Sequence, residues 1–126
     1  MNPRPRRLRV LRFLPNGWLM TSGPTDAARS LYLTFDDGPH PDHTPALLDL
    51  LAEHGAKASF FLVGREVERH DALARRIASE GHTLGNHSYS HPRFEALTLD
   101  EQLEEIERTQ RLLTGIDGRS RHAFRP

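Results

Sequence analysis

Short apolar segments alternate with segments of helical character along residues 31–126, and this alternation constrains the fold more than any other feature of the chain. Four segments are predicted to be strands: 31–36, 57–63, 82–86 and 121–125. Helical signals separate each strand from the next. Strands and helices in this order form right-handed crossovers and a parallel sheet. The sequence therefore predicts an α/β fold whose first strand is short and buried.

The boundaries of three helices are predicted from residues that favour helix ends. Ser, Thr and Asp suit the N-cap, and glycine suits the position after the last turn. The expected N-caps are Thr44, Asp71 and Thr98, and the expected terminating glycines are Gly55, Gly81 and Gly115. The third helix carries the strongest signal, because Thr98 and Glu101 have the spacing of a capping box.

Residues 1–30 lack this periodicity and are predicted to be an Arg-rich N-terminal extension, with the domain occupying residues 31–126. The extension begins like the basic part of a signal peptide, but Arg12 and Pro15 interrupt the apolar part. Export by the standard route is therefore not expected, and a cytoplasmic location is the default expectation. No stretch approaches the roughly 18 apolar residues of a membrane span.

Charge and cysteine content restrict the partners and the possible ligands. Lys+Arg and Asp+Glu both number 17, so the overall charge gives no reason to expect nucleic acid as a partner. One alternative is that the Arg-rich extension itself binds nucleic acid or an acidic surface. The chain has no cysteine, which leaves His, Asp and Glu as the residues that could hold a metal.

Two polar motifs lie where predicted strands end. Asp36 and Asp37 follow the first strand, and adjacent acids are costly unless a cation or a proton compensates them. His87 and His91 follow the third strand, in a tight loop or single helical turn that would let both imidazoles converge. The ends of parallel strands meet at one edge of the sheet. We therefore expect these motifs to lie near each other and near Arg125.

Together these residues form a plausible catalytic metal site. One carboxylate and two imidazoles can hold a divalent ion such as zinc and leave a position open for water. The second aspartate can then accept a proton from that water. A phosphoesterase could use the same ligand set. The other histidines, apart from His122, are expected to be solvated or to lie near helix ends. The acidic run is expected to be a solvated helix face: Glu101, Glu104, Glu105 and Glu107.

The motifs resemble those of the polysaccharide deacetylases, the NodB-homology proteins of carbohydrate esterase family 4. The resemblance rests on several segments in the right order: Thr34-Phe-Asp-Asp-Gly-Pro39, Ala58-Ser-Phe-Phe61, Gly81-His-Thr-Leu-Gly-Asn-His87, His87-Ser-Tyr-Ser-His91 and Phe124-Arg-Pro126. It covers residues 31–126. It implies a distorted (β/α) barrel, of which this chain holds about the first half and lacks the C-terminal part.

The resemblance also implies roles and a substrate. Asp37, His87 and His91 would bind a divalent metal, usually zinc and sometimes another divalent ion, while Asp36 would be the catalytic base and Arg125 would hold Asp36 in place. The reaction would hydrolyse a linear amide, the N-acetyl group of an acetylated polysaccharide or oligosaccharide such as chitin or peptidoglycan. The general acid is expected beyond Pro126. The alternative is a non-catalytic metal- or sugar-binding fragment of such a deacetylase.

Overall fold

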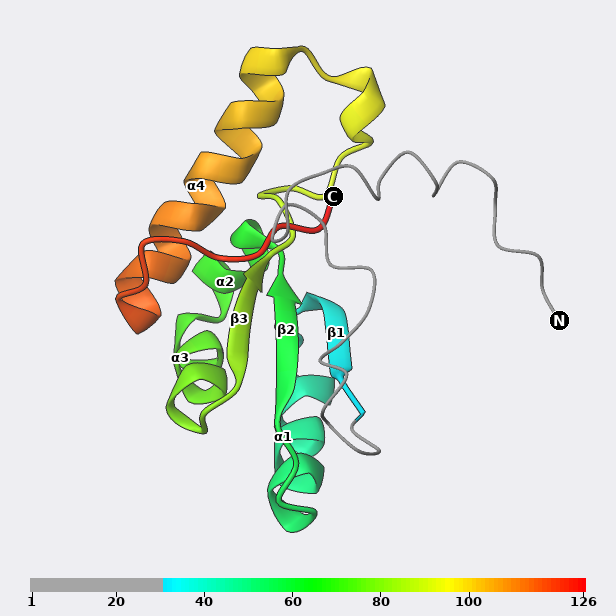
Figure 1. The fold of residues 1–126 in the computed structure, drawn as a ribbon, viewed down its shortest axis with the longest axis vertical. Coiled ribbons are helices and arrows are strands. Elements are labelled where there is room, and N and C mark those ends of the chain that lie inside the picture. The colour runs from blue at the N-terminus through cyan, green and yellow to red at the C-terminus, as the bar shows by residue number, and fades with distance from the viewer. Residues whose placement is uncertain (1–30) are drawn as a thin grey trace, which may run out of the picture. The chain divides into compact units, whose positions relative to one another are not determined.

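Three parallel strands form the sheet at the centre of the computed structural model, which describes residues 31–126. Strand β1 covers Leu33–Gly38, β2 covers Ala58–Leu62 and β3 covers Thr83–Asn86. They pair in the order β1-β2-β3, and both pairs are parallel (Figure 1). The predicted α/β fold is therefore confirmed, whereas the predicted extension at residues 1–30 lies outside the described part.

Strand β1 differs from its prediction in both position and burial. It starts two residues later than expected, at Leu33, and Leu33 is 39% exposed. Among the described residues β1 has one neighbouring strand, so it is an edge strand, and the prediction of a buried strand was wrong. Strand β1 also ends later than predicted, at Gly38, so Asp37 belongs to the strand like Asp36 rather than to a turn that follows it.

Within residues 31–126, four α-helices and one short 3-10 helix follow or separate the strands. They are α1 (His43–Glu53), α2 (Gly64–Arg69), α3 (Asp71–Ser79), the 3-10 helix η2 (Phe94–Ala96) and α4 (Leu99–Asp117). Helix α2 was not predicted, because six residues are too few to show an apolar periodicity. No helix of the described part is long and apolar enough to cross a membrane.

The predicted caps of the first two helices were wrong. Thr44 lies inside α1, and its Oγ1 accepts a hydrogen bond from the His40 amide at 2.9 Å. Asp71 is the first residue of α3 rather than its cap, and its carboxylate pairs with Arg75 Nε at 2.8 Å. Neither side chain therefore accepts a hydrogen bond from the free amide groups at the start of its helix.

Helix α4 has the predicted capping box but a different end. The Thr98 side chain accepts from the Glu101 amide, and the Glu101 carboxylate accepts from the Thr98 amide at 2.8 Å. Gly115 was expected to close the helix, but α4 continues to Asp117. Gly118 is the residue that adopts the left-handed conformation, with φ of 75°. A glycine inside a helix is tolerated at modest cost, so Gly115 alone does not end one.

The predicted fourth strand is reduced to a single bridge between Phe124 and Asn86. The Asn86 amide donates to Ala123 O at 2.8 Å, and the Arg125 amide donates to Asn86 O at 2.9 Å. His122, two residues before Phe124, does not pair with β3. Its amide instead donates to Gln110 Oε1 of α4 at 3.2 Å. The C-terminal segment, red in Figure 1, therefore crosses the end of β3 instead of extending along it.

The core lies between the sheet and the helices. Its buried members include Leu48, Phe60, Leu62, Ile77, Leu84 and Leu113. Phe60 and Leu62 belong to this cluster, and Phe61 points to the other face, as alternation along a strand requires. There the Phe61 ring lies against Gly85 of β3, where an added Cβ would stand 2.6 Å from Phe61 Cδ1. On this face the guanidinium of Arg125 stacks over the Phe61 ring.

Candidate active site

Asp37, His87 and His91 come together at the C-terminal edge of the sheet. Asp37 belongs to the end of β1, and His87 directly follows β3. Asp37 Oδ1 lies 3.3 Å from His87 Nε2 and 3.7 Å from His91 Nε2. One potential ligand atom from each residue falls within 4.8 Å of the others. The structure thus brings together the three residues that the sequence suggested as metal ligands.

His87 is held in one orientation by the C-terminal segment. Its Nδ1 lies 2.8 Å from the backbone oxygen of Arg125, and its side chain is only 5% exposed. A carbonyl oxygen can only accept a hydrogen bond, so Nδ1 carries the proton. Nε2 is then the nitrogen with a free lone pair, and it is the one that faces Asp37. A backbone partner of this kind commonly fixes a metal-binding histidine.

The backbone is strained around the same residues. Asp37, Ser88 and His91 have positive φ values of 69°, 60° and 57°. Such conformations cost side-chain-bearing residues about 1–3 kcal/mol each and are concentrated at functional sites. The histidine motif is therefore a tight loop, the first of the two forms that its sequence allowed, and the surrounding contacts must hold it there.

Asp36 and Arg125 form an ion pair beside the triad. Arg125 Nη1 donates to Asp36 Oδ1 at 2.6 Å and lies 3.3 Å from Thr34 Oγ1. The guanidinium carbon of Arg125 lies 4.0 Å from the centre of the Phe61 ring, so the Arg125 side chain also packs against the face of this ring. This arrangement orients one carboxylate oxygen of Asp36. Among the described residues, Oδ2 has no hydrogen-bond donor.

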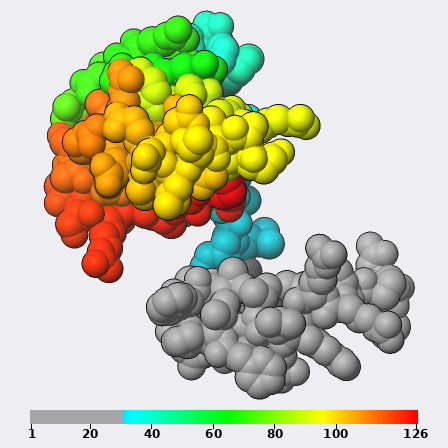
Figure 2. Space-filling model, turned by 90° about the horizontal axis from the view of Figure 1, so that it is seen from above, coloured from blue at the N-terminus to red at the C-terminus, as the bar shows by residue number. Residues whose placement is uncertain are grey.

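Glu105 contributes to the site although its sequence context predicted a solvated residue. Its carboxylate accepts from the amides of Tyr89 and Ser90, at 2.9 and 2.7 Å, and from Ser90 Oγ at 2.8 Å. The expectation that the whole acidic run is solvated was therefore wrong for Glu105. In Figure 2 the segment that leads into α4, drawn in yellow, lies directly against α4 in orange.

Two further histidines are buried: His82, which was expected to lie near a helix end or face water, and His122, for which no role was predicted. His82 accepts at Nδ1 from the Ala58 amide at 3.3 Å, and burial lowers its pKa below 6.5. The side chain of His122 is fully buried, and its Nε2 lies 3.1 Å from Asp117 Oδ1. Both link separate elements of the fold. Only their tertiary surroundings distinguish them from surface histidines, so the sequence carried no signal for either role.

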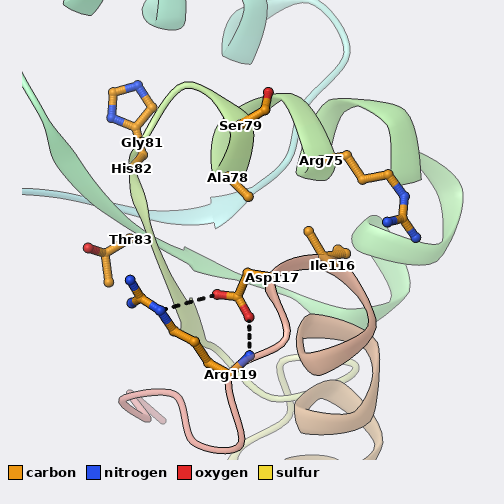
Figure 3. A pocket seen from close by; sticks show the side chains of 9 residues that line it. All are labelled: Arg75, Ala78, Ser79, Gly81, His82, Thr83, Ile116, Asp117 and Arg119. Carbon is orange, nitrogen blue, oxygen red and sulfur yellow. Dashed lines mark hydrogen bonds and ion pairs between the residues drawn. The ribbon is translucent and has the colours of Figure 1, made fainter.

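A hollow of about 380 Å³ opens beside the triad. It is lined by Asp37, Pro39, His40, Val63, Arg65, Glu66 and His91. A second hollow, of about 490 Å³, lies among the ends of α3, β3 and α4 (Figure 3). There Asp117 accepts from the Arg119 amide at 3.0 Å, and none of the predicted site residues lines the wall. The first hollow is therefore the one that a substrate of the triad would enter.

Comparison with known proteins agrees with this geometry. The family model described as polysaccharide deacetylase matches residues 23–126. A peptidoglycan-N-acetylglucosamine deacetylase of Bacillus cereus is 43% identical over 105 residues, which are 83% of this chain and 38% of the relative. A chitooligosaccharide deacetylase of Azorhizobium caulinodans is 40% identical over 95 residues, which are 75% of this chain and 45% of the relative.

Solved structures show the same fold. A peptidoglycan N-acetylglucosamine deacetylase crystallised with 4-naphthalen-1-yl-N-oxidanyl-benzamide superposes with a TM-score of 0.73 at 43% identity. The match covers 75% of this chain and 44% of that one. The chain thus spans less than half the length of these relatives, in agreement with the predicted half of a distorted barrel.

Proposed function

Because the chain belongs to the polysaccharide deacetylase family, we propose that it binds one zinc ion through Asp37, His87 and His91 and hydrolyses the N-acetyl group of an acetylated polysaccharide or oligosaccharide. The observation that carries this proposal is the convergence of three ligand atoms within 4.8 Å of one another. The proposal assigns Asp36 as the catalytic base and Arg125 as the residue that orients it.

The donor set fits a zinc ion in chemistry and in spacing. Carboxylate oxygen and imidazole nitrogen are both ordinary zinc ligands at about 2.0–2.2 Å. Two ligands of a tetrahedral ion at that range are about 3.3 Å apart. The separations of 3.3 and 3.7 Å from Asp37 Oδ1 to the two imidazole nitrogens agree with this value. Three protein ligands also leave one position open, which is typical of catalytic sites.

A zinc ion held there supplies Lewis acidity, which polarises a carbonyl and lowers the pKa of a water molecule. The chain's own residues do the rest. Asp36 accepts the proton of the attacking water at Oδ2, since Oδ1 is occupied by Arg125. The His87–Arg125 contact keeps the proton of His87 on Nδ1 and away from the ligand nitrogen.

The proposed substrate class rests on the relatives and on the hollow. The two relatives described above act on peptidoglycan N-acetylglucosamine and on chitooligosaccharide, by their names. What they share is an N-acetylated amino sugar. The hollow beside the triad, at about 380 Å³, falls in the roughly 300–1,000 Å³ range of small-ligand sites. It can therefore admit one sugar unit with its acetyl group.

The test is acetate release from an N-acetylated chito-oligosaccharide by the full chain loaded with zinc. Asp36→Asn keeps the size of the side chain but removes the base, and is expected to lower the rate by about 100-fold or more. Asp42→Asn is the matched control, because Asp42 is exposed and lies outside the triad at the start of α1. It is expected to change the rate less than about 2-fold.

A second candidate is a non-catalytic metal- or sugar-binding role, which the same three converging ligand atoms would also support. The same assay separates the two. Zinc binding without acetate release would support the binding role and overturn the enzymatic one. Acetate release that depends on Asp36 would exclude the binding role as the sole function.

A further inference from the structure

The loop from Asn86 to His91 has a hydrogen-bond acceptor for every backbone amide. The acceptors for residues 86 to 91, in order, are Ala123 O, Leu62 O, Asn86 Oδ1, Glu105 Oε2, Glu105 Oε2 and Ser88 Oγ. Two loop carbonyls are also bound, because Gly64 and Arg65 at the start of α2 donate to Ser88 O and Tyr89 O at 2.9 Å each.

One side chain from a distant helix supplies the acceptors at the middle of the loop. Glu105 Oε2 accepts from the Tyr89 and Ser90 amides, and Oε1 accepts from Ser90 Oγ. All three distances lie between 2.7 and 2.9 Å, the range of charge-assisted hydrogen bonds. Among the described residues, Glu105 is the sole acceptor for these two amides. Its loss would leave both unpaired in a partly buried place.

The helical turn that carries Glu105 is aimed at this loop by further contacts. The carbonyl of Ile106 accepts from Asn86 Nδ2 at 2.9 Å. The guanidinium of Arg108 stands 3.6 Å from the centre of the Tyr89 ring. These contacts place α4 against both ends of the Asn86–Tyr89 segment. They leave Glu105 little freedom to turn away from the loop.

We propose that Glu105 is a positioning residue that fixes the loop in the conformation in which His91 faces Asp37 and His87. This rests on the proposed metal-binding function. His91 follows Ser90 directly and has a positive φ of 57°, and its side chain is 49% exposed. Neither its own backbone preference nor burial holds the imidazole in place. The His91 amide donates to Ser88 Oγ at 3.1 Å, and the hydrogen bonds of the preceding residues to Glu105 supply the remaining restraint.

The competing explanation is that Glu105 only adds stability as one of several acids on α4. Glu104 provides the comparison, because it lies on the same helix, pairs with Arg111 at 3.6 Å and has a 67% exposed side chain. Removing Glu104 changes the charge of α4 by the same amount and touches no loop amide. A role in positioning must therefore appear with Glu105 and not with Glu104.

The experiment measures zinc affinity of the full chain by competition with a chromophoric chelator. Glu105→Ala is expected to weaken zinc binding by about 10- to 100-fold, the usual cost of removing support from a metal ligand. Glu104→Ala is expected to stay within about 2-fold of the unchanged chain. Glu105→Gln should restore most of the affinity, because its amide oxygen can accept the two backbone N–H groups and its NH₂ can donate to Ser90 Oγ.

Two additions keep the test decisive. If Glu105→Ala does not fold, Glu105→Asp retains the charge but withdraws the carboxylate, and an affinity equal to that of the unchanged chain would overturn the proposal. Amide hydrogen exchange without zinc reports the loop directly: Tyr89 and Ser90 should lose protection in Glu105→Ala and keep it in Glu104→Ala.

The outcomes for Glu105 and for the metal site are separable. Unchanged zinc affinity in Glu105→Ala would contradict the positioning role and leave the metal site standing. Absence of zinc binding in the unchanged chain would overturn the proposed metal function. The positioning role would then be judged by exchange at Tyr89 and Ser90, with unchanged protection counting against it and selective loss supporting it.

Discussion

Arg125 and Asp36 are 89 positions apart in the sequence and are joined by a hydrogen bond of 2.6 Å. Arg125 also serves the metal side of the site, because its backbone oxygen accepts from His87 Nδ1 at 2.8 Å. The side chain and the backbone of one residue thus support two different parts of the proposed mechanism. A substitution that changes only the side chain can separate them.

Arg125→Ala is expected to lower acetate release by about 10- to 100-fold, because misplacing a catalytic group by about 1 Å can cost 100-fold. Zinc affinity is expected to stay within about 3-fold, since the backbone oxygen that binds His87 is unchanged. Arg121→Ala is the matched control, as Arg121 is exposed and precedes the same segment. A parallel loss of zinc affinity in Arg125→Ala would contradict this division of roles.

Gly85→Ala is expected to destabilise the fold by about 1–3 kcal/mol, because overpacking forces neighbouring side chains to move. The added Cβ would lie 2.6 Å from Phe61 Cδ1 and 2.7 Å from Phe61 Cε1. The free energy of unfolding in urea measures this change.

Gly115→Ala is the matched control for Gly85→Ala. A Cβ added at Gly115 would have no atom of the described residues within 4 Å, apart from its own helix backbone, and Gly115 lies inside α4. Alanine in a helix interior is expected to stabilise the fold by about 0.5–1 kcal/mol. The two substitutions should therefore have opposite signs, and equal effects would contradict the packing described for Phe61.

His82 is expected to make stability fall with acidification. Burial lowers its pKa below 6.5 and Lys57 lowers it further, while Glu80 opposes the shift. Above pH 6.5 the residue is neutral in both states and has no effect. As the pH falls below 6.5, the unfolded state takes up the proton first, so the free energy of unfolding decreases until the folded pKa is reached.

His82→Asn tests this pH dependence. Asn keeps an acceptor for the Ala58 amide but does not titrate. Urea unfolding between about pH 7 and pH 5 should show a shallower loss of stability in this variant. His54→Asn, at an exposed position after α1, should retain the slope of the unchanged chain. An unchanged slope in His82→Asn would show that another group causes the acid sensitivity.

Local sequence signals were sufficient for the three paired strands and for the polar motifs at their ends, but not for the burial of β1 or for the predicted fourth strand. The apolar run ending at Phe61 and Leu62 predicts β2, because a short apolar segment bounded by polar residues is typical of a buried strand. The two histidines and the pair of adjacent acids were identifiable because their chemistry and their positions at strand ends point to one edge of the sheet, and the family resemblance singled out Asp37 as the acid that would bind the metal. The capping box at Thr98 was equally local, and it was confirmed.

The contact of Arg125 with Asp36 was expected from the family resemblance. The contacts of Glu105 and His122 could not be predicted, because they depend on which elements pack together. Glu105 has the sequence context of any solvated acid, and its contact with Tyr89 and Ser90 exists only once α4 lies on the loop. The 121–125 segment has strand character, but the bonds of His122 to α4 limit it to one bridge. Tertiary contacts overrode local preference in both places.

The proposed metal site is tested most directly by a zinc titration of the metal-free chain by calorimetry, compared with His87→Ala and with the exposed-position control His54→Ala. We expect one zinc ion per chain, loss of that binding in His87→Ala, and unchanged binding in His54→Ala. Zinc binding that survives in His87→Ala, or no binding by the unchanged chain, would contradict a metal site formed by Asp37, His87 and His91.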